Sequence, residues 1–185
     1  MKILQSFLEQ SISVKQAIQK DEHFGAAFEQ ATQVLLKVRE QGGTIFSAGN
    51  GGSACDAMHL SEELTARYKR ERSGIKAIHF LDAAAMSCWS NDYSYTDYFK
   101  RQVETFCTPD DCFIAISTSG NSANLIEAVR CCKQLQVPTI GLLGKDGGAL
   151  AELVDTPLVV PSSETDRIQE VHILLIHAFC EALEQ

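Results

Sequence analysis

This sequence contains fewer basic than acidic residues. Its 185 residues include 16 Lys and Arg against 24 Asp and Glu, which gives a net charge of −8 at pH 7. No stripe of basic side chains is present that could follow a nucleic acid backbone, and this absence argues against such a partner. A small anion is still compatible with the composition, because backbone N–H groups at the start of a helix bind phosphate locally.

Long apolar runs are also missing. No segment approaches the roughly 20 apolar residues of a membrane-spanning helix, so no membrane partner is expected. The first 20 residues lack the unbroken apolar region and the small-residue cleavage site of a signal peptide. We therefore expect a cytoplasmic protein. Because 45% of the residues are hydrophobic, one domain over 1–185 with a full-sized core is expected.

Cysteines are present, but no pair has the CxxC spacing. There are seven of them, an odd number: Cys55, Cys88, Cys107, Cys112, Cys131, Cys132 and Cys180. A disulfide framework is therefore not expected, and reduced cysteines used as small apolar residues are favoured. Cys55, beside a glycine-rich turn, is the one candidate for a reactive thiol.

Short apolar segments alternate with longer segments of helical periodicity. Strands are expected at 44–49, 75–81, 112–116, 138–144 and 156–161, and helices at 1–20, 24–41, 53–66, 123–136 and 164–184. The aromatic-rich segment SNDYSYTDYF (90–99) is expected to be a loop. This alternation predicts an α/β fold: a three-layer α/β/α sandwich with a parallel sheet of about five strands, plus an N-terminal helical pair. The pair (1–41) would serve subunit packing, and 42–185 would form the α/β core.

Two strand-to-helix turns have an unusual composition. GNGGS (49–53) allows close backbone approach and positive φ angles. STSGNS (117–122) places four hydroxyls at the end of a strand and before a helix, where N–H groups and the helix dipole favour phosphate. A single Ser122 or Asn121 could merely cap that helix. Neither turn is a Walker A loop or a complete G-x-G-x-x-G motif, so a sugar phosphate is favoured over a nucleotide.

A histidine and a carboxylate follow the first turn. His59 and Glu63 are four residues apart and lie on one face of the expected helix, a spacing that suits metal ligands or an acid/base pair. A solvated His/Glu pair is the alternative. Glu62 could compete with Glu63, although it lies about 100° further round the helix.

The last expected helix carries polar interruptions on an otherwise apolar background. Gln169, His172 and His177 are these residues, and a buried histidine usually just satisfies a hydrogen bond. Gln169 and His177 are separated by about 12 Å of helical rise, so a shared metal would need both side chains to reach along the axis. Alternatively, one of them serves a site completed by another subunit.

Five motifs in the same order resemble the bacterial phosphoheptose isomerases, a family of the sugar isomerase (SIS) domain superfamily. They are GNGGSACDAMHLSEELTARY, SND, ISTSGNSANLIEA, GKDGG and DRIQEVHILLIH, and the match runs from about 40 to 180. The resemblance implies a flavodoxin-like SIS fold and a homotetramer with sites between subunits. It also implies conversion of sedoheptulose 7-phosphate into D-glycero-D-manno-heptose 7-phosphate through an enediolate, the first step toward the heptose of lipopolysaccharide.

The resemblance also implies roles for individual residues. Glu63 and His177 would be catalytic, as general base and acid, and one zinc per subunit would be bound by His59, Glu63, Gln169 and His177. Substrate contacts would fall on Asn50, Gly51, Gly52, Ser53, Arg67, Asn91, Asp92, Ser117, Thr118, Ser119, Ser122, Asp166 and Gln169. One rival is a protein-binding factor of the same fold without catalysis. The other is an isomerase or deaminase of a different sugar phosphate, because the turns recognise only the phosphate.

Overall fold

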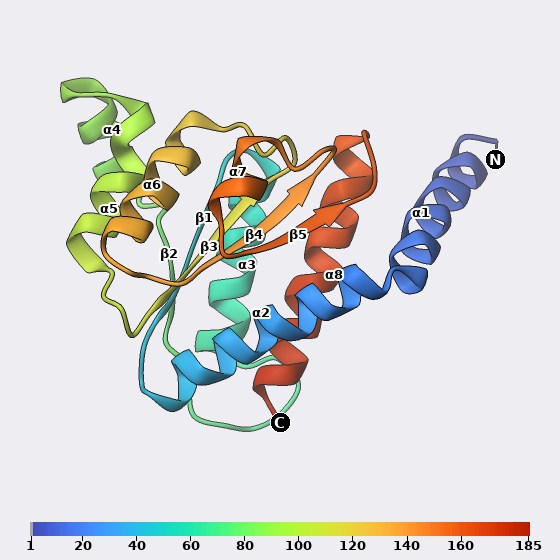
Figure 1. Ribbon diagram of the computed structural model, residues 1–185, viewed down its shortest axis with the longest axis horizontal. Helices are drawn as coiled ribbons and strands as arrows, with labels where there is room; N and C mark the ends of the chain where they lie inside the picture. Colours follow the sequence, from blue (N-terminus) through green and yellow to red (C-terminus); the bar gives the residue numbers. More distant parts are fainter. Residues whose placement is uncertain (1) are drawn as a thin grey trace.

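Strands and helices alternate along the chain, as the sequence predicts, in a computed structural model that describes residues 2–185 (Figure 1). The helices are α1 Lys2–Lys20, α2 Glu22–Glu40, α3 Gly52–Thr65, α4 Ala83–Asp92, α5 Tyr98–Phe106, α6 Ala123–Gln134, α7 Gly148–Leu153 and α8 Thr165–Leu183, with a 3-10 turn η1 at Tyr95–Asp97. The strands are β1 Ile45–Gly49, β2 Ala77–His79, β3 Cys112–Ser117, β4 Thr139–Gly144 and β5 Thr156–Val160.

The five strands form one parallel sheet in the order β2-β1-β3-β4-β5. This order is that of the flavodoxin-like doubly wound folds. Side chains alternate across the sheet: Ile114 and Ile116 of β3 enter one core, and Phe113 and Ala115 enter the other. All residues of β1, β3 and β4 are buried, which explains their nearly continuous apolar sequences.

Helices cover both faces of the sheet, and this confirms the three-layer prediction. Helices α2, α3 and α8 pack on the face that carries Ile114. Helices α5, α6 and α7 pack on the opposite face, together with part of α4 (Figure 1). None of the helices in residues 2–185 is long and apolar enough to cross a membrane.

The N-terminal helical pair is present. Asp21 separates α1 from α2 and caps α2, since its carboxylate accepts hydrogen bonds from the N–H groups of His23 and Phe24. Helix α2 packs on the core, whereas α1 buries no residue and extends away from the sheet (Figure 1). Its apolar side chains are exposed at Ile3, Leu4, Phe7, Leu8 and Ile12.

The segment 82–108 differs from expectation. The predicted loop 90–99 is mostly helical: it contains the end of α4, the turn η1 and the start of α5. Tyr98 and Phe99 are fully buried, so tertiary packing overrides a composition that favours a loop. Helix α7 was not predicted either, because it has only six residues and begins at the second of two successive glycines. Strand β2 is shorter than the predicted 75–81.

His172 is a buried core residue that satisfies a hydrogen bond, which is the usual role of a buried histidine. Its Nε2 lies 3.0 Å from the carbonyl oxygen of Leu143 in β4. Because a carbonyl only accepts, Nε2 carries the proton, and Nδ1 is buried without a partner among the described residues. Burial lowers the pKa of His172 to about 4, although the hydrogen bond to Leu143 opposes this shift.

This histidine makes folding sensitive to acid. Its folded pKa lies below the value of about 6.5 in an unfolded chain, so the unfolded state binds more protons between these values and stability falls as pH drops. From pH 7 to pH 5 the wild type should lose about 2 kcal/mol of unfolding free energy through this residue. His172→Gln keeps a donor for Leu143 and should lose correspondingly less. Denaturant unfolding at both pH values measures this, with His23→Gln on the exposed side of α2 as control. Equal pH slopes for wild type and His172→Gln would contradict the assignment.

Candidate functional site

The site lies at the carboxyl edge of the sheet, where β1 and β3 are neighbours. The chain leaves β1 through α3 toward β2 and leaves β3 through α6 toward β4, so the two connections diverge. Ligands in doubly wound sheets bind at this switch point. Gly49 at the end of β1 pairs with Ile116 near the end of β3. The two turns singled out in the sequence, 49–53 and 117–122, therefore start side by side.

The first turn depends on glycine for two reasons. Gly51 has a φ of +56°, which L side chains rarely adopt. A Cβ at Gly52 would lie 2.1 Å from Nε2 of Gln169, so the absence of a side chain leaves room for Gln169 of α8. Ser53 is buried in the first turn of α3. The predicted site residues Gly51, Gly52, Ser53 and Gln169 are thus brought together.

The hydroxyls of the second turn lie close to one another. Oγ of Ser117 accepts a hydrogen bond from the N–H of Gly120 at 3.1 Å and lies 3.3 Å from Oγ of Ser122. Ser122 occupies the N-cap position of α6, but its side chain makes no capping hydrogen bond. Ser119 accepts from the N–H of Asn121 at 3.2 Å, and Thr118 is half-buried. Simple capping therefore does not account for Ser122.

An amide pair joins the first turn to the start of α6, directly after the second turn, and this contact was not predicted. Nδ2 of Asn50 donates to Oδ1 of Asn124 at 3.0 Å, and Nδ2 of Asn124 donates back to Oδ1 of Asn50 at 2.9 Å. The hydroxyl of Tyr95 also donates to Oδ1 of Asn50. Asn124 is buried, so these bonds hold the two turns in a set relation. Tyr95 lies in the segment predicted to be a loop, and no spacing rule connects it to Asn50.

Three potential metal ligands meet between α3 and α8. Nε2 of His59 lies 3.1 Å from Oε1 of Glu63 and 3.3 Å from Nε2 of His177, and Nε2 of His177 lies 3.9 Å from Oε1 of Glu63. These three residues are all half-buried. The pairing of His59 with Glu63 was predicted from spacing, whereas the arrival of His177 required the packing of α8 on α3. We call His59, Glu63 and His177 the ligand cluster.

The ligand cluster forms within one subunit. Gln169 faces Gly52 at the start of α3, and His177 faces His59 further along α3, so the two helices run in the same direction. The separation of Gln169 and His177 therefore does not by itself require a second subunit. The role of Gln169 as a metal ligand stays a prediction.

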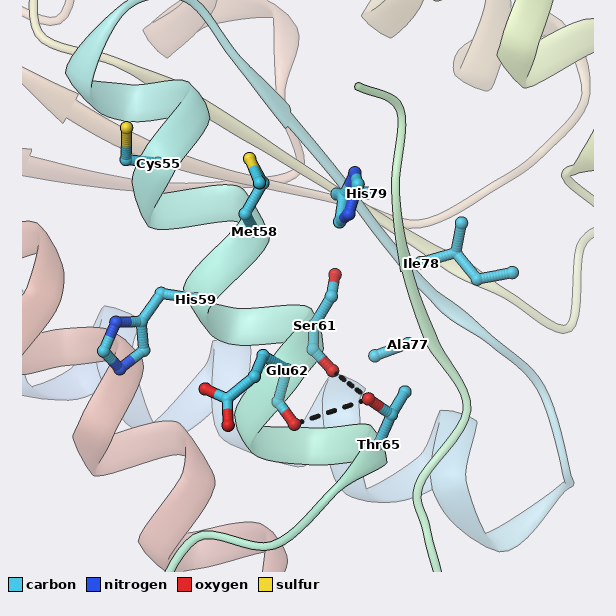
Figure 2. Close-up of a pocket in the computed structure, with 9 residues that line it drawn as sticks. All are labelled: Cys55, Met58, His59, Ser61, Glu62, Thr65, Ala77, Ile78 and His79. Carbon is cyan, nitrogen blue, oxygen red and sulfur yellow. Dashed lines mark hydrogen bonds between the residues drawn. The ribbon is translucent and has the colours of Figure 1, made fainter. Parts of the chain in front are cut away.

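A groove of about 720 Å³ lies between α3 and β2 and borders the cluster only through His59 (Figure 2). In Figure 2, His59 extends from α3 toward α8, whereas Ala77, Ile78 and His79 form the opposite wall. Glu62 lines the groove, so Glu63 rather than Glu62 is the carboxylate that the structure places in the ligand cluster. Cys55 is exposed on the groove, and five of the seven cysteines are buried.

Other predicted residues lie outside the cluster. Arg67 is exposed, with Glu71 as a distant ion-pair partner at 3.9 Å. Asn91 and Asp92 are exposed at the end of α4, where Nδ2 of Asn91 donates to Asp92. Asp166 pairs with Arg167, and the hydrogen bond from Arg167 lowers the pKa of Asp166. Their roles in substrate binding stay predictions.

Asp56 is a residue near the cluster that the sequence did not single out. Burial raises its pKa to about 6, while the nearby His59 has the opposite effect. Its Oδ2 is buried and has no hydrogen-bond partner within residues 2–185. Asp56 and His59 are three residues apart on one helix, so their spacing could have indicated this proximity, whereas the burial of Asp56 depends on how α3 packs.

Comparisons with known proteins agree with the observed fold. The family model described as SIS domain matches residues 6–144. The phosphoheptose isomerase of Helicobacter pylori (strain ATCC 700392 / 26695) is 45% identical over 173 residues, which cover 92% of this chain and 90% of the relative. The solved phosphoheptose isomerase GmhA of Neisseria gonorrhoeae superposes with a TM-score of 0.92 at 36% identity, over 99% of this chain and 97% of that one. That of Francisella tularensis gives 0.94 at 32% identity, over 100% and 97%.

Proposed function

Because this chain belongs to the phosphoheptose isomerases of the SIS domain family, and is therefore a sugar-phosphate isomerase, we propose that it converts sedoheptulose 7-phosphate into D-glycero-D-manno-heptose 7-phosphate. This reaction would supply the heptose precursor of lipopolysaccharide. The observation that carries the proposal is the position of the ligand cluster between α3 and α8, relative to the two turns. His59 is seven residues from Gly52, about 10 Å along the helix from the turns that suit a phosphate. One ligand with a phosphate at one end and a carbonyl at the other fits this arrangement.

An aldose–ketose isomerase must move a proton between C1 and C2 of its substrate. Glu63 is the proposed base: it removes the proton from C1 of the ketose, which leaves an enediolate, and the proton returns at C2. His177 is the proposed acid, and it transfers a proton between the oxygens on C1 and C2. Oε1 of Glu63 lies 3.1 Å from Nε2 of His59 and 3.9 Å from that of His177, so both groups reach the same ligand.

The donors of the ligand cluster fit a zinc ion. Two imidazole nitrogens and one carboxylate oxygen are typical zinc ligands, and ligands about 2.0–2.1 Å from a tetrahedral ion lie roughly 3.3 Å from one another. The observed separations of 3.1, 3.3 and 3.9 Å are close to this spacing. We propose one zinc per subunit, held by His59, Glu63 and His177 with Gln169 as a further ligand. When bound, zinc polarises the substrate carbonyl.

The substrate contacts are proposed on the two turns and on nearby polar residues. The serine turn would bind the phosphate through Ser117, Thr118, Ser119 and Ser122. The glycine turn and Gln169 would contact the sugar, with Asn50 supplying mainly its backbone because its side chain bonds Asn124 and Tyr95. Arg67, Asn91, Asp92 and Asp166 complete the proposed set.

Glu63→Gln should remove most of the turnover, because the amide cannot accept the C1 proton. A fall in kcat of about 10²–10⁴-fold is expected for the loss of one acid/base group. The assay incubates the protein with sedoheptulose 7-phosphate, with and without added zinc, and identifies the product. Glu62→Gln on the adjacent groove is the matched control. Near-wild-type activity of Glu63→Gln would rule out this base, and turnover of a different sugar phosphate alone would replace the proposed substrate.

Ser119→Ala tests the serine turn. If its hydroxyl binds the phosphate equally in the ground state and the transition state, the substitution should raise KM more than it lowers kcat. Loss of one hydrogen bond to a charged group typically costs about 1.5–3 kcal/mol, which corresponds to a rise in KM of roughly 10- to 100-fold. Steady-state kinetics measure this, with Thr105→Ala on the exposed side of α5 as control. Unchanged KM would remove Ser119 from the phosphate site.

We also propose a homotetramer with sites between subunits, as the family resemblance implies, and the exposed apolar side chains of α1 support a contact between subunits. Only Val14 and Ile18, toward the end of this helix, pack against the core, whereas five large apolar side chains nearer its start are exposed. Leu4→Glu combined with Leu8→Glu should lower the mass measured by light scattering without changing the circular dichroism spectrum. Gln5→Glu on the same helix is the control. An unchanged mass for the double variant would show that α1 does not hold the subunits together.

A further inference from the structure

The segment that follows α3 is held by a buried carboxylate from the far end of the chain. Glu184 follows α8, and its side chain is only 1% exposed. Its two oxygens accept hydrogen bonds from the backbone N–H groups of Tyr68 at 3.2 Å, Lys69 at 3.0 Å and Arg70 at 3.0 Å. Three successive N–H groups that converge on one carboxylate are a specific anion site, so this contact sets the path of the backbone over residues 68–70.

Arg72 ties the same carboxylate to α3. Its Nε donates to Glu184 at 3.1 Å, and its Nη1 and Nη2 donate to the carbonyl oxygens of Leu64 and Glu63 at 2.8 Å each. The last carbonyls of a helix lack partners within the helix and favour a positive charge. The guanidinium of Arg72 therefore connects the end of α3, residues 68–72 and the end of α8. One of the carbonyl groups that it binds belongs to Glu63 of the ligand cluster.

Tyr68, the first residue of this segment, contacts the ligand cluster. Its ring stacks on the imidazole of His177, with centroids 5.6 Å apart and planes 17° apart. The same imidazole meets His59 edge to face, at 5.1 Å and 69°. The side chain of His177 is 40% exposed, and the two rings of Tyr68 and His59 are its aromatic neighbours. The ring of Tyr68 therefore lies against the face of the imidazole whose Nε2 is 3.3 Å from His59 and 3.9 Å from Glu63.

We propose that Tyr68 and Glu184 are positioning residues for His177. Glu184 anchors residues 68–70, and Tyr68 then orients the imidazole toward His59 and Glu63. Neither residue needs to touch the substrate. The catalytic role of His177 rests on the proposed function. The positioning role can be tested without it, because the orientation of the imidazole also governs metal binding by the ligand cluster. Metal ligands must be held within about 0.5 Å of their working positions, and outer residues provide this support.

The test compares four single variants by metal affinity and by turnover. Tyr68→Leu removes the aromatic face, Tyr68→Phe keeps it, and Glu184→Gln replaces one acceptor oxygen by an NH2 group that faces N–H donors. Glu181→Gln is the matched control: it lies one turn earlier on α8, and Glu181 pairs with Lys69 of the same segment, but at an exposed position. Zinc affinity is measured by competition with a chromophoric chelator, and the visible absorption of bound Co²⁺ reports ligand geometry.

Tyr68→Leu and Glu184→Gln should each lower zinc affinity and kcat by roughly 10- to 100-fold, with a changed Co²⁺ spectrum and a small change in KM. Tyr68→Phe and Glu181→Gln should stay within about 2-fold of wild type. A purely structural role would lower stability but leave zinc affinity and the Co²⁺ spectrum of the folded variant unchanged, and that result would overturn the proposal. Equal losses in Tyr68→Phe and Tyr68→Leu would also overturn it, because the hydroxyl would then matter rather than the ring.

Two further outcomes keep the proposals separate. If Glu184→Gln fails to fold, the comparison of Tyr68→Leu with Tyr68→Phe still decides whether the ring orients His177. If the wild type does not convert sedoheptulose 7-phosphate, the proposed function fails, while zinc affinity across the variants still decides the positioning role. A wild type with neither turnover nor metal binding would overturn both.

Discussion

The packing of α8 along α3 is the contact on which the rest of the site depends. The two helices share a core that includes Leu60 and Leu64 of α3 and Ile168 and Leu175 of α8. They run in the same direction, so the start of α8 faces the glycine turn and its later residues face His59 and Glu63. Burial of apolar surface supplies the driving force for this contact. The same packing brings together the polar side chains that flank the apolar stripe of each helix.

The edge of the sheet supplies the second half of the site. The order β2-β1-β3-β4-β5 forces the connections after β1 and β3 to diverge, and this leaves the carboxyl ends of both strands uncovered by a crossing helix. The amide pair of Asn50 and Asn124 then joins the two turns, and Tyr95 adds a third bond. A buried amide that loses its partner costs roughly 1–3 kcal/mol, so this pair keeps the distance between the turns well defined.

The two ends of α3 are supported in different ways. At its start, Gly51 supplies the positive φ of the turn, and Gly52 leaves room for the side chain of Gln169. At its end, Arg72 binds the last carbonyl oxygens and is held in turn by Glu184. The helix that carries His59 and Glu63 is therefore constrained from both sides, as expected for a helix whose side chains must meet a residue from another element.

The sequence alone determined much of this protein. Alternating apolar strands and helices predicted the parallel three-layer fold, because hydrophobic periodicity reflects which faces are buried. The spacing of four residues placed His59 beside Glu63, since helical geometry is local. The hydroxyls and glycines after β1 and β3 indicated the two turns, because turn composition is also a local property of the sequence. Five motifs in order indicated the family before any contact was known.

Only the tertiary structure decided the contacts between distant segments. Tyr98 and Phe99 are helical because their rings are buried, although their neighbours favour a loop. His177 lies 118 residues from His59, and no local rule brings them to 3.3 Å. The same holds for Asn124 with Asn50 and for Glu184 with the backbone of residues 68–70. Such contacts depend on how whole elements pack, and packing is a property of the folded chain rather than of any short stretch of it.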